Sequence, residues 1–164
     1  MSQNVAGVDL ETSLGYLLKE ASSALRAAME EVLRPLGMSV THYSCLELLA
    51  QRPGLSNSEL ARGAFVTRQS MNVLVQALER EGSVTRPAEE AVGKVLPTRL
   101  TPLGRRNLEK ATAAVRSVEL RMLAGLTEAE QSGASRVLRS MVRSLRDGAP
   151  RSRPGAQEPF PGSP

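Results

Sequence analysis

Residues 65–82 read FVTRQSMNVLVQALEREG and carry two sets of side chains with different chemistry. The apolar set recurs at i, i+3, i+4 and i+7, the spacing of a core-facing helix side, and consists of Met71, Leu74, Val75 and Leu78. The polar set lies on the other side and consists of Arg68, Gln69, Asn72 and Gln76. Guanidinium and amide groups form paired hydrogen bonds, and the polar set holds no carboxylate. It therefore suits a partner with an acidic backbone and base edges.

Catalytic chemistry finds no comparable pattern in the chain. The single histidine, His42, and the single cysteine, Cys45, are too few for a zinc site within one chain. The carboxylate pairs Glu30–Glu31 and Glu89–Glu90 are sequence neighbours, whose side chains diverge on a helix. No glycine-rich phosphate loop is present. We therefore expect no enzyme, no metal and no cofactor.

Charge is distributed unevenly over the 164 residues. Residues 1–55 hold four basic and six acidic side chains (net −2), whereas residues 56–106 hold eight and five (net +3). Residues 107–147 hold seven and five (net +2), and the remaining residues add one positive charge, which gives +4 in total. A basic region within an otherwise mildly acidic chain is the electrostatic signature of polyanion binding.

Three further features concern the cellular compartment. No run of 18 apolar residues predicts a membrane span, so we expect no membrane partner. Residues 1–15 lack the basic start and apolar block of a signal peptide. One cysteine excludes an intrachain disulfide framework. These features together favour a cytoplasmic protein.

Apolar periodicity and capping residues predict where the first four helices begin and end. Apolar periodicity predicts a helix from Leu10 to Leu33, which the Pro35–Gly37 pair ends, and Thr41 is predicted to cap a second helix through Ala50. Ser56 and Glu59 form a capping box that opens a short helix to about Gly63. Thr67 is the predicted N-cap of the helix with the polar stripe, and Gly82 closes it.

A hairpin and two more helices follow. Residues 83–86 and 95–101 are candidate strands, and Pro97 restricts the second to an edge or an irregular ladder. Thr101–Pro102 begins a helix to about Ala124, and Thr127 with Glu130 forms a capping box for the last helix. The predicted fold is mostly α, an α+β winged helix-turn-helix with six helices and a two-stranded β-wing.

The apolar stripes of the first and last helices are broad for one small core, so we expect them to pair with a second copy in a homodimer. The predicted organisation is a flexible N-terminus (1–9), an N-terminal dimerisation helix (10–40), a winged helix-turn-helix lobe (41–101), C-terminal dimerisation helices (102–147) and a disordered tail (148–164).

The order of these elements resembles the MarR family of bacterial transcriptional regulators. The residues that carry the resemblance are THYSCLELLAQRPGLSNSELARGAFVTRQSMNVLVQALEREGSVTR and then TRLTPLGRR, which is similar to the family's "LT..G" junction between wing and long helix. The resemblance covers roughly residues 10–147. It implies a dimer that binds an inverted repeat in double-stranded DNA, often as a repressor of its own or a neighbouring operon that a small molecule or oxidant releases.

Carried over by position, the resemblance implies a recognition helix at residues 67–81. Its candidate contacts to base edges or phosphates are Arg68, Gln69, Ser70, Asn72 and Gln76. Arginine suits guanine, and glutamine or asparagine suits adenine. Ser58, Arg62 and Thr67 are candidates for phosphate contacts, which set the register on the duplex but read no sequence.

The wing departs from the family pattern, which often has Asp-x-Arg with the arginine in the minor groove. Residues 88–94 read AEEAVGK, with two carboxylates that would repel phosphate. Either Lys94, with Arg86 or Arg99 nearby, replaces the missing arginine, or the wing contributes little to binding. The acidic wing also keeps open an alternative function, a protein-interaction module that has the winged-helix fold without DNA binding.

Effector binding has only indirect candidates. The family commonly holds aromatic acids or lipophilic compounds, and the polar or aromatic groups nearest such a crevice would be Tyr16, Arg26, His42 and Tyr43. Some members sense peroxide through a cysteine on the first helix, whereas Cys45 falls on the second helix beside Leu46 and Leu49. Two interpretations of Cys45 therefore stay open: a thiol switch, or a small side chain buried in the core.

Overall fold

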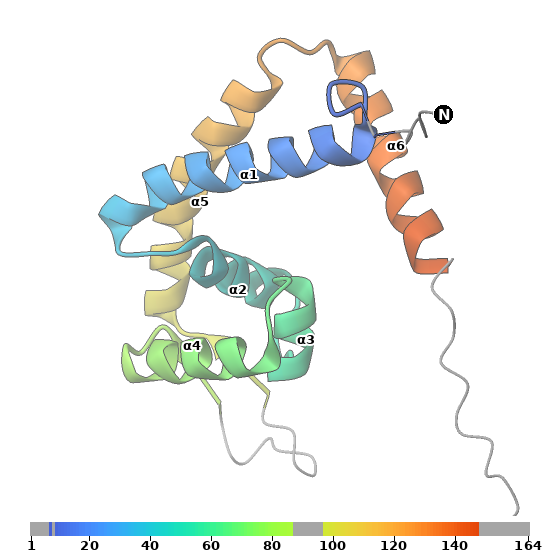
Figure 1. The fold of residues 1–164 in the computed structure, drawn as a ribbon. Coiled ribbons are helices and arrows are strands. Elements are labelled where there is room, and N and C mark those ends of the chain that lie inside the picture. The colour runs from blue at the N-terminus through green and yellow to red at the C-terminus, as the bar shows by residue number, and fades with distance from the viewer. Residues whose placement is uncertain (1–6, 8, 87–96, 148–164) are drawn as a thin grey trace, which may run out of the picture. The chain divides into compact units, whose positions relative to one another are not determined.

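The computed structural model describes residues 7, 9–86 and 97–147 (Figure 1). The described residues form six α-helices, one 3-10 helix and a two-stranded sheet. In chain order the elements are α1 (Leu14–Leu33), η1 (Arg34–Leu36), α2 (Val40–Gln51), α3 (Asn57–Gly63), α4 (Arg68–Arg80), β1 (Val84–Thr85), β2 (Arg99–Leu100), α5 (Pro102–Leu123) and α6 (Glu128–Asp147). The predicted fold class is confirmed. None of the described helices is long and apolar enough to cross a membrane.

Two predicted helix starts are wrong, and both errors concern the capping side chain. The first helix begins at Leu14 rather than Leu10, because the Ser13 side chain accepts the backbone N–H of Tyr16. The second begins at Val40, because Ser39 is extended and its Oγ accepts the N–H of His42 at 3.1 Å. Thr41, the predicted cap, is already helical.

The predicted caps around α3 and α4 are confirmed. Ser56 and Glu59 form a reciprocal capping box at α3, and the Oγ1 of Thr67 accepts the N–H of Ser70 at the start of α4. Between the two helices, Phe65 takes the left-handed conformation (φ 57°) and is 85% exposed. The N–H of Val66 then donates to the carbonyl of Ala61, which ends α3 as a Schellman-type turn.

Within the described residues, the sheet pairs fewer residues than the two predicted strands contain. The strands β1 and β2 pair antiparallel over two residues each, with Val84 opposite Leu100 and Thr85 opposite Arg99. Directly before β2, Thr98 bridges to Leu55 instead of pairing with Arg86. The predicted hairpin loop, which includes Lys94, lies outside the described residues.

The start of α5 closes the sheet against α4. The Oγ1 of Thr101 donates to the carbonyl of Gly82 at 2.5 Å and accepts the N–H of Gly104 at 3.1 Å. The N–H of Thr101 donates to the carbonyl of Ser83 at 3.1 Å. The predicted junction between wing and long helix is thus a turn in which one threonine holds the end of α4 and the first turn of α5.

The core is aliphatic and lies among α1, α2, α3, α4 and α5, with α2 between α1 and α4 (Figure 1). Its fully buried members include Leu33, Leu46, Leu60, Met71 and Val75. Contacts divide the chain into two compact units, residues 1–122 and 123–164, and the second contains α6. The predicted capping box of α6 is confirmed, since Thr127 and Glu130 exchange hydrogen bonds.

Candidate nucleic-acid interface

The helix α4 has one buried side and one exposed side. Met71, Val75 and Leu78 are 0–1% exposed and anchor the helix in the core. On the opposite side Gln69, Val73, Gln76 and Arg80, at spacings of four, three and four residues, are all exposed; we call them the outer row. The outer row offers two amides and one guanidinium, which are hydrogen-bonding groups for base edges and phosphates.

Sequence reasoning assigned neither Val73 nor Arg80 to this surface. Val73 is 62% exposed although it is apolar. The signal was available, because residues 69, 73, 76 and 80 share one helix face by spacing. The prediction had instead grouped Arg68 and Asn72 with the two glutamines.

Arg68 and Ser58, both predicted contacts, are brought together by the structure. The Nε of Arg68 donates to the Oγ of Ser58 at 2.8 Å, which joins the first residue of α4 to α3. Arg68 is exposed, so its remaining guanidinium N–H groups face solvent. Arg62, on α3, is exposed as well. These cations and the outer row make one surface of α3 and α4 available to an anionic partner.

Thr67 and Ser70 form hydrogen bonds with each other at the amino end of α4. The Oγ1 of Thr67 donates to the Oγ of Ser70 at 2.9 Å and also accepts the backbone N–H of Ser70. Both residues are exposed. Their first role is to cap the helix that carries the outer row.

Asn72 lies in a different environment from the one predicted. It is half-buried, and its Oδ1 accepts a hydrogen bond from the Nδ2 of Asn57, the first residue of α3. An adenine contact would need that same oxygen as acceptor and the amide nitrogen as donor. Asn72 therefore lies at the contact between α3 and α4. It is not part of the outer row that contains Gln69.

The described part of the wing contains two of its three predicted cations. The guanidinium of Arg86 bonds to the Glu79 carboxylate of α4, with an Nη2–Oε2 distance of 2.5 Å, and its side chain is only 18% exposed. Arg99 is exposed on β2, and Lys94 lies outside the described residues. Arg86 thus ties the wing to α4, and Arg105 and Arg106 are exposed at the start of α5.

The four predicted effector contacts have different surroundings. Tyr16 is 45% exposed on α1, and Arg26 forms an ion pair with Glu30 at 3.0 Å. Burial lowers the pKa of His42 on α2, and the carboxylate of Glu81 opposes that shift. Burial raises the pKa of Tyr43, which bonds to Thr112 of α5. His42 and Tyr43 thus interact with different elements.

An apolar groove between α1 and α5 was not predicted. It has a volume of about 330 Å³ and is lined by Ala21, Ala24, Leu25, Ala28, Val118, Arg121 and Met122. Small side chains at residues 21, 24 and 28 recur on one side of α1 and leave this hollow, a signal that the sequence contains. Arg121 supplies a positive charge beside otherwise apolar walls.

Cys45 is fully buried. Burial in this aliphatic environment raises its thiol pKa to about 12, so the reactive thiolate is scarce at neutral pH. Among the described residues no three His, Cys, Asp or Glu side chains are grouped as metal ligands.

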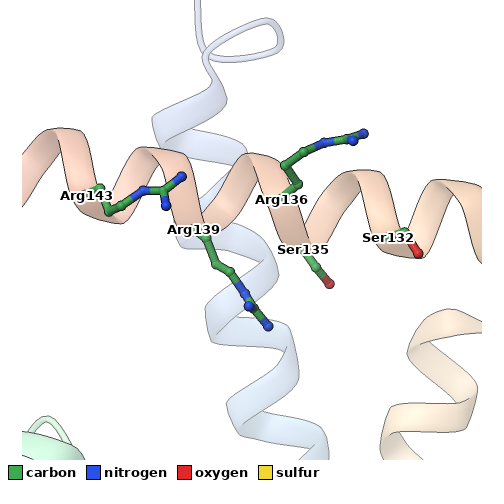
Figure 2. Close-up of a pocket in the computed structure, with 5 residues that line it drawn as sticks. All are labelled: Ser132, Ser135, Arg136, Arg139 and Arg143. Atoms are coloured by element: carbon green, nitrogen blue, oxygen red, sulfur yellow. The ribbon is translucent and has the colours of Figure 1, made fainter.

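The helix α6 has a basic surface hollow of its own. It is lined by Ser132, Ser135, Arg136, Arg139 and Arg143 (Figure 2). Arg136 and Arg139 leave the helix on opposite sides in Figure 2, so their guanidinium groups do not converge on one point. This surface is a row of solvated cations rather than a closed anion site.

The capped helix pair, the exposed outer row and the short hairpin define a winged helix-turn-helix protein. The MarR family model matches residues 36–94. The HTH-type transcriptional repressor Rv2887 of Mycobacterium tuberculosis is 42% identical over 135 residues, which cover 82% of this chain and 97% of the relative. The chain therefore belongs to the MarR family. Its members are transcriptional regulators, which confirms the prediction that the protein is not an enzyme.

Two solved structures of Rv2887 are also similar to this chain. The complex with DNA has 41% sequence identity and a TM-score of 0.66, and the match covers 79% of this chain and 98% of that one. The complex with salicylic acid has 42% identity and a TM-score of 0.67, and the match covers 79% of this chain and 96% of that one.

Proposed function

We propose that the protein is a homodimeric, sequence-specific DNA-binding repressor of its own or a neighbouring operon, which a small aromatic acid releases. It acts in the cytoplasm, together with the DNA it binds. The observation that carries the proposal is α4, whose inner side is fully buried while its outer row presents amides and a guanidinium to solvent.

DNA binding is supported by the chemistry at the exposed surface of α3 and α4. The side chains that suit base edges or phosphates are Ser58, Arg62, Arg68, Gln69, Gln76 and Arg80. Arg68 is oriented by its bond to Ser58, which lowers the entropy it would lose on contacting DNA. The relative Rv2887, at 41% identity, has a structure in complex with DNA.

Dimerisation is supported by apolar side chains that the single chain leaves exposed. On α1, Leu14 is 65% exposed, and on α5, Leu120 is 64% exposed. Exposed apolar rows on two helices favour a protein–protein interface. A twofold dimer would present two copies of α4 to the two halves of an inverted repeat.

Release by an aromatic acid is supported by the groove between α1 and α5. Its alanine, leucine and methionine side chains suit an aromatic ring, and Arg121 suits a carboxylate. The relative Rv2887 has a structure in complex with salicylic acid. Salicylic acid contains both an aromatic ring and a carboxylate. His42 and Tyr43 remain candidates for a second contact region.

Selection of bound duplexes from a random pool, followed by gel shift at several salt concentrations, tests the proposal. We expect an inverted repeat with half-site centres about 10 base pairs apart or a multiple of that spacing. Affinity should fall as salt rises, and millimolar salicylate should weaken it. Light scattering should give the mass of a dimer.

An absence of sequence-selective, salt-sensitive binding would overturn the proposal. It would favour the protein-interaction module that the acidic residues at 88–94 keep open. A monomeric mass at micromolar concentration would remove the dimer alone.

A further inference from the structure

The outer row of α4 contains one apolar side chain, Val73. It is 62% exposed, whereas Val75 on the inner side is 0% exposed. At 100° per residue, the four members of the outer row fall within an arc of about 60°. Val73 lies at one edge of that arc, and along the helix axis it lies between Gln69 and Gln76.

Folding does not account for a valine at this position. Val73 is absent from the hydrophobic core and from the partly buried side chains that pack against it. Valine is also a weaker helix former than alanine, glutamine or arginine, since its branched side chain loses rotamer freedom on a helix. The side chain therefore gives the isolated protein neither packing nor helix propensity.

We propose that Val73 reads the 5-methyl group of a thymine in the major groove. The inference rests on the proposed function, because it assigns a task to one side chain of the DNA-binding helix. Thymine alone among the four bases presents a methyl group there, and the other base edges present hydrogen-bond donors or acceptors. A valine over those edges would exclude water without replacing its hydrogen bonds, which disfavours every base except thymine.

The spacing along α4 places this thymine relative to the two amides. Val73 lies about 6 Å along the helix axis from Gln69 and about 4.5 Å from Gln76, at 1.5 Å per residue. Base pairs are stacked about 3.4 Å apart. The valine therefore faces a base pair between those that the two glutamines reach, and the contact recurs once in each half-site.

The test is a thermodynamic cycle on the operator selected by the wild-type protein. Each thymine of one half-site is replaced in turn by deoxyuridine, which removes only the 5-methyl group. Affinities are measured for the wild-type protein and for Val73→Ala. We expect one thymine whose replacement weakens wild-type binding about fourfold, the factor that one buried methylene is worth. The same replacement should leave Val73→Ala unaffected.

Two matched measurements separate the readout from a structural role. Thermal unfolding of Val73→Ala should show no loss of stability, because Val73 is outside the core and alanine is the better helix former. Repeating the selection with Val73→Ala should relax the preference for thymine at that one position and leave the rest of the site unchanged.

The contrary outcomes are distinct. If Val73→Ala loses the same affinity for thymine and deoxyuridine duplexes, the valine acts structurally and the inference fails while the proposed function stands. An unchanged selection with no coupled thymine has the same consequence. If the wild-type protein selects no sequence at all, the proposed function fails and the inference fails with it.

Discussion

Gly104 lies directly against the carbonyl of Ser83, and a Cβ at Gly104 would stand 2.0 Å from that oxygen. Real Cβ atoms do not approach a backbone oxygen this closely, so glycine alone allows α5 to begin where it does. The same carbonyl accepts the N–H of Thr101, which prevents it from turning away. The glycine of the family's junction motif is thus a packing requirement between the end of α4 and the first turn of α5.

Gly104→Ala should therefore destabilise the protein by about 3 kcal/mol, the scale of overpacking in a core. Urea unfolding would measure the change. Gly125→Ala is the matched control, because an added Cβ there would meet nothing within 4 Å. Equal stabilities for the two variants would contradict the steric argument.

Phe65→Gly should stabilise the protein relative to Phe65→Ala by about 1 kcal/mol. Both variants remove the exposed ring, but only glycine adopts the left-handed backbone of this residue (φ 57°) without strain. Thermal and urea unfolding of the two variants would give the difference. If alanine were as stable as glycine, the turn after α3 would carry no conformational strain.

Arg68→Ala and Asn72→Ala should have opposite profiles. Arg68 is exposed, so its removal should weaken operator binding by about 1–3 kcal/mol with little change in the unfolding temperature. Asn72 bonds to half-buried Asn57, so its removal should lower stability by about 1–3 kcal/mol. Gel shift and thermal unfolding on both variants would decide. An Asn72 variant that unfolds like the wild type but binds DNA poorly would support its predicted role in base readout.

The unfolding free energy should fall as pH drops below 6.5, because burial places the folded-state pKa of His42 below its ordinary value. The unfolded chain then binds the proton more tightly, and the loss ends once pH lies below the folded pKa. Urea unfolding between pH 7.5 and 5.5 would measure it, and His42→Gln should remove the dependence. The lowered pKa values of the capping carboxylates Glu59 and Glu130 act in a separate window, below pH 4.5. A wild-type slope that persists in His42→Gln would refute the assignment.

Cys45 should resist alkylation in the folded protein, because its thiol is fully buried and its pKa is raised to about 12. Reaction with a maleimide at pH 7.5 should be slow and should accelerate in urea. Cys45→Ser should leave the response of DNA binding to peroxide unchanged. Rapid modification of the native protein would instead support a thiol switch.

Local signals in the sequence were sufficient for most elements. The Ser56–Glu59 box, the Thr67 cap and Gly82 each act within a few residues, and each is found as predicted. The start of α2 was missed because Ser39 and Thr41 are both good caps, and the choice between them depends on which lies outside the first turn.

Contacts between elements were beyond the reach of periodicity. The stripe of α4 predicts which residues face away from the core, but only the position of α3 decides that Asn72 is half-buried and Gln69 exposed. The pairing of Arg86 with Glu79 likewise joins residues from two elements. The exposure of Val73 follows from its spacing with Gln69 and Gln76, although its apolar residue type favours the core side.

The bond between Arg86 and Glu79 has a consequence for how DNA binding would respond to ionic strength. A solvated arginine that reaches a phosphate releases a counterion from the duplex, and the released ions set the salt dependence of the affinity. Arg86 is already neutralised by a carboxylate of its own chain, so phosphate has to displace Glu79 from it. In that exchange a phosphate replaces the Glu79 carboxylate as the partner of Arg86. The displaced carboxylate then attracts a cation from solution, which offsets the cation that the duplex releases. If Arg86 contacts a phosphate, the number of released ions would therefore not reveal that contact.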